Sequence, residues 1–172
     1  ISKKVHSSYL LKAQKGQFTG CLAPFGYRKD PEDKNHLLID EETAPIVRRL
    51  FAWALEGHGP NYIRRRLEEE KIPCPTYWNR VRGLRNVSTK WEKKDPVNGR
   101  YIWDFSVIKD ILMNPVYTGA IASQKKEYRF KIGTIGEKKP EEWIVVENQH
   151  EPLVDRKTFD IVQRKLKSRQ RP

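Results

Sequence analysis

The sequence predicts an α+β fold: a helical core with a helix-turn-helix-like arrangement, a small antiparallel β-hairpin and a C-terminal helix. Two observations carry this prediction. Apolar residues recur every three or four positions in several segments separated by proline or glycine, and shorter runs alternate apolar with polar residues. Of the 172 residues, 37% are hydrophobic and 33% charged, which is typical of one domain with a modest core and a heavily charged surface.

The first fifteen residues predict the end of a longer helix. Tyr9 and Ala13 share one face at helical spacing, and lysines surround them. Gly16 is a suitable helix stop. The stretch 16–30 that follows is too rich in glycine and proline for a helix, and its aromatic residues are unusual for a flexible linker. We therefore expect a junction whose Tyr27 packs into the core.

A second helix is predicted after a polar turn and a short extended run at 37–39. It starts shortly after Asp40 and ends at Gly57, and Pro45 fits only into its first turn. Its apolar stripe consists of Ile46, Val47, Leu50, Phe51, Ala54 and Leu55.

A third helix is predicted over 60–71 and is ended by the prolines that follow it. The residues expected to face inward are Tyr62, Ile63 and Leu67. The next segment, 76–100, has little periodicity, many basic residues and two tryptophans, so we expect a long loop insert. Loops of this length inside a compact domain are uncommon and are usually functional or disordered.

The C-terminal half predicts two more helices. One spans about 105–113 and ends at Asn114-Pro115, and the other begins after Asp155. The residues expected to face inward are Phe105, Ile108, Ile111 and Leu112 in the first, and Phe159, Val162 and Leu166 in the second.

Strands are predicted between these two helices. Residues 117–123 have strand composition, and the segments 127–133 and 141–148 alternate or run apolar as strands do. We expect the last two to pair as a hairpin across the loop at 133–140.

The charge distribution points to a polyanionic partner. The net charge is +12, with a pI near 9.7. Four blocks carry the excess: +5 in 1–30, +5 in 76–100, +4 in 125–140 and +5 in 164–172. With two cysteines and four scattered histidines, no metal site and no cofactor is expected. No run of apolar residues is long enough for a membrane span, so no membrane partner is expected.

The helices at 60–71 and 105–113 have the order of a helix-turn-helix with a long insert in the turn. In that arrangement the N-terminal residues of the second helix reach base edges in the major groove. Ser106 and Lys109 are expected on or near that face. The pattern also fits a plain helical core, so by itself it leaves DNA binding open.

An ordered set of motifs resembles the recombinase domain of large serine recombinases, the integrases and transposases of phages and mobile elements. The motifs are GCLAPFGYRKD at 20–30, LLIDEETAPIVRRLFAWALEGHGPNYIRRRLEEEKIPCP at 37–75, Trp103 followed by VIKDILMNPVYTGAI at 107–121, and HEPLVDRKTFDIVQRKL at 150–166. They cover nearly the whole chain. The insert at 76–100 is longer than in many relatives, so contacts are not transferred into it.

The resemblance implies a division of labour within a longer protein. Its catalytic domain, with the serine that attacks a DNA phosphodiester, would lie upstream, so no catalytic residue is expected here. Residues 1–16 would be the end of the long helix from that domain, and 17–172 the DNA-binding recombinase domain. A zinc-ribbon domain usually follows. The first residue, Ile1, agrees with the expectation of a fragment.

The implied partner is double-stranded attachment-site DNA, of which the chain would bind one half-site, in a parent that forms dimers or tetramers through other domains. The implied location is the cytoplasm, in a bacterial or phage-encoded protein. Basic side chains prefer narrow minor grooves, and by resemblance the segment after the long helix crosses one. The candidate DNA-binding residues are Lys12, Lys15, Gln17, Arg28, Arg64, Arg65, Arg80, Arg82, Arg85, Ser106, Lys109, Arg129 and Lys131.

Three alternatives remain at the level of sequence. A helix-turn-helix regulator would need a dimer interface. A stand-alone nuclease would need a metal at Asp40, Glu41 and Glu42, carboxylates that a helix start also explains. RNA binding is the third.

Overall fold

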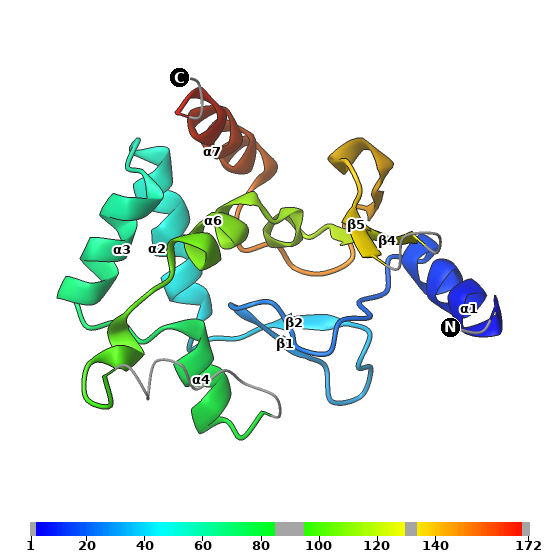
Figure 1. Cartoon of the computed structure of the whole chain (residues 1–172), viewed down its shortest axis with the longest axis horizontal. Helices are drawn as coiled ribbons and strands as arrows, with labels where there is room; N and C mark the ends of the chain where they lie inside the picture. The colour runs from blue at the N-terminus through cyan, green and yellow to red at the C-terminus, as the bar shows by residue number, and fades with distance from the viewer. Residues whose placement is uncertain (1–2, 85–94, 130–133, 170–172) are drawn as a thin grey trace. The chain divides into compact units, whose positions relative to one another are not determined.

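The computed structural model describes residues 3–84, 95–129 and 134–169 and has the predicted α+β fold (Figure 1). Two compact units make up the chain: unit 1 is formed by Ile1–Val47 and Asn114–Arg156, and unit 2 by Arg48–Met113 and Lys157–Pro172. Helices α2 (Ala44–Leu55) and α7 (Arg156–Ser168) each run across a boundary between the units. No helix in the described ranges is long and apolar enough to span a membrane.

In its described residues, unit 1 combines an N-terminal helix with three two-stranded antiparallel sheets. Helix α1 (Lys3–Gln14) packs against β3 (Ile121–Ser123) and β6 (Ile144–Val146), which pair with each other. It ends where predicted, at Gly16, whose φ of +67° favours glycine. Strand β1 (Tyr27–Lys29) pairs with β2 (Leu37–Ile39), the extended run predicted from sequence.

The predicted hairpin between 127–133 and 141–148 is wrong. Strand β4 (Lys126–Arg129) pairs with β5 (Thr134–Glu137), which lies in the segment expected to be the loop, and β6 pairs with β3. Closing a short loop loses less chain entropy than closing a long one, so β4 takes the nearer partner. Strand β6 is then available to the more distant β3, whose Ile121 is buried.

Two tyrosines and a histidine form the centre of unit 1. The rings of Tyr27 and Tyr117 stack with centroids 5.9 Å apart, and the His150 ring meets Tyr27 edge-on at 4.8 Å. The Tyr27 hydroxyl donates to the Glu151 carbonyl at 2.9 Å and accepts the Leu153 N–H at 3.2 Å. With 3% of Tyr27 exposed, the prediction that it packs into the core is confirmed.

His150 makes unit 1 sensitive to acid. Its Nε2 lies 2.7 Å from the Val116 carbonyl, which can only accept, so Nε2 carries the proton. Its buried Nδ1 has no hydrogen-bond partner in the described part of the chain. Burial lowers the pKa of His150 below its usual 6.5, and the nearby His36 lowers it further, while the hydrogen bond to Val116 acts in the opposite direction.

We expect unit 1 to lose stability as the pH falls below about 6.5. There the unfolded chain takes up a proton at His150 more readily than the folded chain, because the folded pKa is depressed. The loss continues until the pH passes below the folded pKa. Urea unfolding of wild type and His150→Gln over this range measures it: the glutamine keeps a donor for Val116 and cannot titrate. Equal pH slopes for the two proteins would contradict the assignment.

Unit 2 is helical. Helix α2 starts at Ala44. In the turn before it, which begins at Asp40, the Thr43 hydroxyl donates to the Asp40 carboxylate at 2.7 Å. Pro45 therefore sits in the first turn, as predicted, and Gly57, at φ +102°, follows the helix end. The helices that come next in the unit are α3 (Pro60–Glu69), α4 (Pro75–Val81), the 3-10 turn η1 (Gly99–Tyr101) and α6 (Phe105–Met113).

Helices α3 and α6 agree with the sequence prediction and pack against each other. In α7, Phe159, Val162 and Leu166 are buried, as expected, and Phe159 packs against Phe51 of α2 at 6.1 Å. The helix-turn-helix interpretation of α3 and α6 stays a prediction.

The expected loop over 76–100 is wrong at both ends, because Pro75–Val81 is helix α4 and Gly99–Tyr101 is a 3-10 turn, and its middle part, 85–94, lies outside the described residues. The cause is tertiary. The backbone N–H of Cys74 donates to the Arg100 carbonyl at 2.8 Å, and the indole N–H of Trp103 donates to the Ile72 carbonyl at 2.9 Å. Helices shorter than about twelve residues are marginal alone, so α4 depends on these long-range bonds more than on its own seven residues.

Two aromatic residues assigned to inward faces, Tyr62 and Phe105, are exposed instead, and so is Tyr9 on the apolar repeat of the first helix. Tyr9 is 51% exposed, and Tyr62 and Phe105 are 43% exposed each. Each shares its helix with a smaller residue that fills the core position: Ala13, Ile63 and Ile108 are almost fully buried. Leu55, at 36% exposed, likewise lies at the edge of its stripe.

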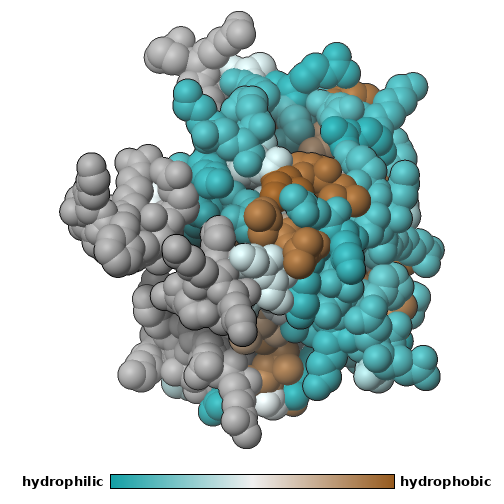
Figure 2. Space-filling model, turned by 90° about the vertical axis from the view of Figure 1, so that its right-hand side faces the viewer, coloured by the Kyte–Doolittle hydropathy of each residue, from teal (hydrophilic) through white to brown (hydrophobic). Residues whose placement is uncertain are grey.

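Hydrophilic residues predominate on one side of the molecule (Figure 2). Figure 2 shows one face, on which hydrophilic residues cover most of the described area and apolar residues form small separate patches. This agrees with the modest core expected from the composition.

Candidate nucleic-acid interface

The start of α6 is built around Asp104. Its carboxylate accepts hydrogen bonds from the backbone N–H and the hydroxyl of Ser106, both at 2.9 Å. The backbone and hydroxyl bonds from Ser106 lower the pKa of the Asp104 carboxyl, and the positive charge of Arg64 on α3 adds to the effect. The Ser106 hydroxyl proton is therefore engaged at this helix start, although the residue is exposed.

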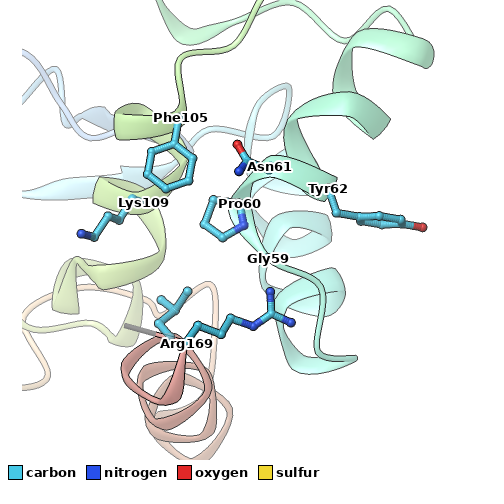
Figure 3. A pocket seen from close by; sticks show the side chains of 8 residues that line it. Gly59, Pro60, Asn61, Tyr62, Phe105, Lys109 and Arg169 are labelled. Carbon is cyan, nitrogen blue, oxygen red and sulfur yellow. The ribbon is translucent and has the colours of Figure 1, made fainter. Parts of the chain in front are cut away.

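Lys109 lies one turn further along α6 and lines a cavity of about 440 Å³ in unit 2. Figure 3 shows the Phe105 ring facing Pro60, with the Tyr62 ring pointing away from both. Arg169 lines the same cavity and donates a hydrogen bond to the Gly57 carbonyl. The residues around the cavity are Gly59, Pro60, Asn61, Tyr62, Phe105, Lys109, Leu166 and Arg169. This face thus combines apolar side chains with two cations.

The three consecutive arginines of α3 have different surroundings. Arg64 pairs with Glu68 at 3.9 Å, and Arg66 pairs with Glu70 at 3.0 Å. Arg65 is exposed and has no ion pair within the described residues. The consecutive positions splay around the helix, so only the middle arginine keeps an unneutralised charge for a ligand.

The junction after α1 is tied to the turn between β1 and β2. The Phe18 N–H donates to the Asn35 carbonyl at 2.8 Å, and the Asn35 amide donates back to the Phe18 carbonyl at 2.7 Å. Lys29 lies over the Phe18 ring at 5.6 Å. Sequence reasoning named Tyr27 as the residue that packs this segment into the core and missed Phe18, whose only signal in the sequence is its place between Gly16 and Gly20.

The candidates of unit 1 flank this junction. Lys15 and Arg28 are exposed, whereas Lys12 and Gln17 are half-buried. The Gln17 N–H donates to the Lys12 carbonyl and the Gly16 N–H to the Ala13 carbonyl, both at 3.0 Å, which closes the helix end as a Schellman motif.

The remaining candidate residues lie on α4 or just after it, on β4, or outside the described residues. Arg80 is exposed on α4, and Arg82, just after it, stacks on Trp78 at 5.2 Å. Arg85 and Lys131 lie outside the described residues, and for Arg129 only the backbone, in β4, is described.

The structure therefore places Arg64, Arg65, Ser106 and Lys109 on α3 and α6, two helices of unit 2 that pack against each other. Arg80 and Arg82 belong to the same unit, while the candidates near α1 and β1 belong to unit 1. Arg100, which sequence reasoning did not single out, lies over the ring of Tyr77 and over that of Tyr101, with its guanidinium carbon 5.8 and 5.2 Å from the two centroids. In the sequence, Arg100 could have been noticed because Tyr101 and Trp103 follow it closely.

No group of three metal-ligating side chains occurs in the ranges that the structure describes. The Asp40 carboxylate, considered above for a nuclease metal, accepts from Thr43 and from the Glu42 N–H at 3.3 Å. Its geometry is that of a helix start.

Two solved structures share this fold. One, described as a crystal structure of an LSR–DNA complex, aligns with a TM-score of 0.55 and 16% identity over 96% of this chain and 39% of its own. The other, concerned with the sequence requirements of the Listeria innocua prophage attP site, aligns with a TM-score of 0.58 and 16% identity over 96% of this chain and 52% of its own. This chain thus spans about two fifths of the length of the first protein and about half of the length of the second.

A family model described as Recombinase matches residues 41–169, which is most of the chain and includes all of the helices of unit 2. The motifs that carried the resemblance from 41 onward fall inside this match. The chain therefore belongs to the Recombinase family, the recombinase domain of the large serine recombinases.

Proposed function

We propose that this chain binds double-stranded DNA in a sequence-specific manner and recognises one half-site of a recombination attachment site. The observation that carries the proposal is the packed pair of helices α3 and α6, of which α3 presents the exposed Arg65 and α6 presents Lys109. The net charge of +12 supports a polyanionic ligand. The fold shared with an LSR–DNA complex supports DNA as that ligand.

In this proposal the helix α6 enters the major groove and Lys109 reaches a base edge or a phosphate. Arg65 binds a backbone phosphate, and the junction near Lys15 and Arg28 follows the minor groove. The chain itself has no catalytic role. The parent protein cuts and rejoins DNA in the cytoplasm with a serine upstream of this piece, assembling as a dimer or tetramer through other domains.

Selection from a randomised duplex library, followed by fluorescence anisotropy, tests this proposal. We expect the selected duplex to bind more tightly than a random-sequence duplex, and both affinities to fall by orders of magnitude between about 50 and 200 mM salt. Equal affinity for the selected and random duplexes would refute sequence-specific recognition. Light scattering on the free chain gives a further check, because a stable dimer would favour a regulator instead.

Replacing Arg65 by alanine should weaken binding about equally for selected and random duplexes, with a salt slope smaller by about 1. The reason is the loss of one phosphate contact. Arg66→Ala is the matched control, because the Arg66 guanidinium already forms ion pairs with Glu69 and Glu70. Equal losses in the two variants would show that the ion pairs of α3 do not decide which arginine meets DNA.

A further inference from the structure

A cluster of aromatic and arginine side chains lies where α4 and η1 meet in unit 2. We call it the α4–η1 cluster, and its members are Tyr77, Trp78, Arg82, Arg100 and Tyr101. The Arg100 guanidinium lies 5.8 Å from the Tyr77 ring centroid and 5.2 Å from that of Tyr101, and Arg82 lies 5.2 Å from that of Trp78. Such contacts use the flat face of the guanidinium and hold it in one orientation.

The backbone beneath Arg100 is fixed. Its carbonyl accepts the Cys74 N–H at 2.8 Å, which joins η1 to the start of α4. Next to it, the Asp95 carboxylate accepts the N–H groups of Val97 and Asn98, both at 2.9 Å. These backbone bonds lower the pKa of the Asp95 carboxyl. Arg100 therefore projects from a braced turn.

Arg100 keeps donors available. Its Nε donates to the Val97 carbonyl at 3.2 Å, while its two Nη atoms have no hydrogen-bond or ion-pair partner among the residues described. A guanidinium presents its N–H groups in the plane of the fork, at right angles to the stacked faces. Two parallel N–H donors at the edge of such a plane match the oxygens of a phosphate.

The charge around the cluster favours an anion. Residues 72–84 contain two arginines and no acidic residue. The Asp95 carboxylate accepts both backbone N–H groups at one oxygen, Oδ1, and forms no ion pair with Arg100 among the residues described. DNA is the more suitable anionic partner for Arg100, because a duplex carries phosphates all along its length. An acidic protein would need a carboxylate at the one matching position.

We propose that Arg100 binds a backbone phosphate of the duplex and that the α4–η1 cluster is a contact separate from the face of α3 and α6. The inference rests on the DNA binding proposed above. Since a phosphate contact carries no sequence information, Arg100 positions the protein on DNA and does not read bases. Tyr77 and Tyr101 act through Arg100 by holding its plane.

Arg49 provides a matched control. Its guanidinium also stacks on an aromatic ring, that of Trp53 at 4.7 Å, and it is likewise in unit 2. Unlike Arg100, it forms an ion pair with Glu70. The two arginines thus share the stacking and differ in whether a carboxylate already occupies the fork.

The test is anisotropy with a random-sequence duplex and with the duplex selected from the library, over a salt series. Arg100→Ala should weaken binding to both duplexes by about tenfold, because at least one charge-assisted hydrogen bond to a phosphate is lost. The salt slope should fall by about 0.9, for one phosphate lost. Arg100→Lys keeps the charge but not the fork and should lose affinity with little change of slope, while Arg49→Ala should change neither.

Each outcome decides. Unchanged affinity and slope in Arg100→Ala, with a salt-sensitive wild type, overturns this inference alone. A loss confined to the selected duplex also overturns it, because it indicates a base contact. A wild type that binds no duplex overturns the proposed function as well. If thermal unfolding shows Arg100→Ala to be unstable, Arg100→Gln, which keeps a polar side chain without the charge, must show the same two changes.

Discussion

Replacing Tyr27 by alanine is expected to destabilise unit 1 by about 3–5 kcal/mol, the range for large aromatic truncations in cores. The side chain is 3% exposed and lies against Tyr117 and His150. Its removal leaves a cavity and also leaves the Leu153 N–H and the Glu151 carbonyl without their partner. Urea unfolding followed by circular dichroism measures the change in the free energy of unfolding.

Two controls separate the contributions at Tyr27. Tyr27→Phe keeps the ring and should be destabilised by about 1–3 kcal/mol, because only the hydrogen bonds of the hydroxyl are lost. Tyr9→Ala removes a tyrosine that is 51% exposed and should change stability by no more than about 0.5 kcal/mol. If the Tyr27→Ala protein were as stable as wild type, Tyr27 would not anchor the junction in the core of unit 1.

Trp103→Ala should destabilise unit 2 by a similar amount, about 3–5 kcal/mol. Trp103 is 1% exposed, and its indole N–H donates to the Ile72 carbonyl just beyond α3. It immediately precedes Asp104, which starts α6, so its loss frees the start of α6 from the end of α3. Chemical unfolding measures the stability, and anisotropy with the selected duplex measures the accompanying loss of affinity.

Trp53→Ala is the matched control for Trp103. Trp53 is half-buried and its ring is covered by the Arg49 guanidinium, so a smaller loss is expected, without loss of DNA affinity. If both tryptophan variants lost the same stability and the same affinity, Trp103 would have no special part in placing α6.

The helices could be predicted because their signals are local. Pro60 lies at the first helical position of α3, and the apolar repeats of α2, α6 and α7 have helical spacing. Local periodicity identifies which face is apolar, but it does not say where that face ends. Tyr62 and Phe105 fit the repeat and are nonetheless exposed.

The strand partners could not be predicted in the same way. The segment around Ile144–Val146 has strand composition, but composition does not select a partner. Pairing with β3 rather than β4 brings together residues more than twenty positions apart in the chain. That choice depends on which apolar side chains are buried together.

In the candidate site, too, some features could be predicted from the sequence and others depend on the tertiary structure. The sequence placed Arg64, Arg65, Ser106 and Lys109 on two helices, and the structure packs those helices together. The sequence did not separate Arg65 from its neighbours, because ion pairs with Glu68 and Glu70 depend on side-chain geometry. Nor did it identify Arg100, whose stacking partners lie on α4 and in its own turn.

By itself the sequence determined the α+β class, the bounds of most helices, the basic charge and the membership of the Recombinase family, since these depend on composition, local periodicity and the order of motifs. Only the tertiary structure decided that β6 pairs with β3, that α4 forms within the expected loop, and which arginines keep unneutralised charges. The physical reason is that these features result from hydrogen bonds, burial and ion pairs between residues distant in the chain, which leave no local pattern.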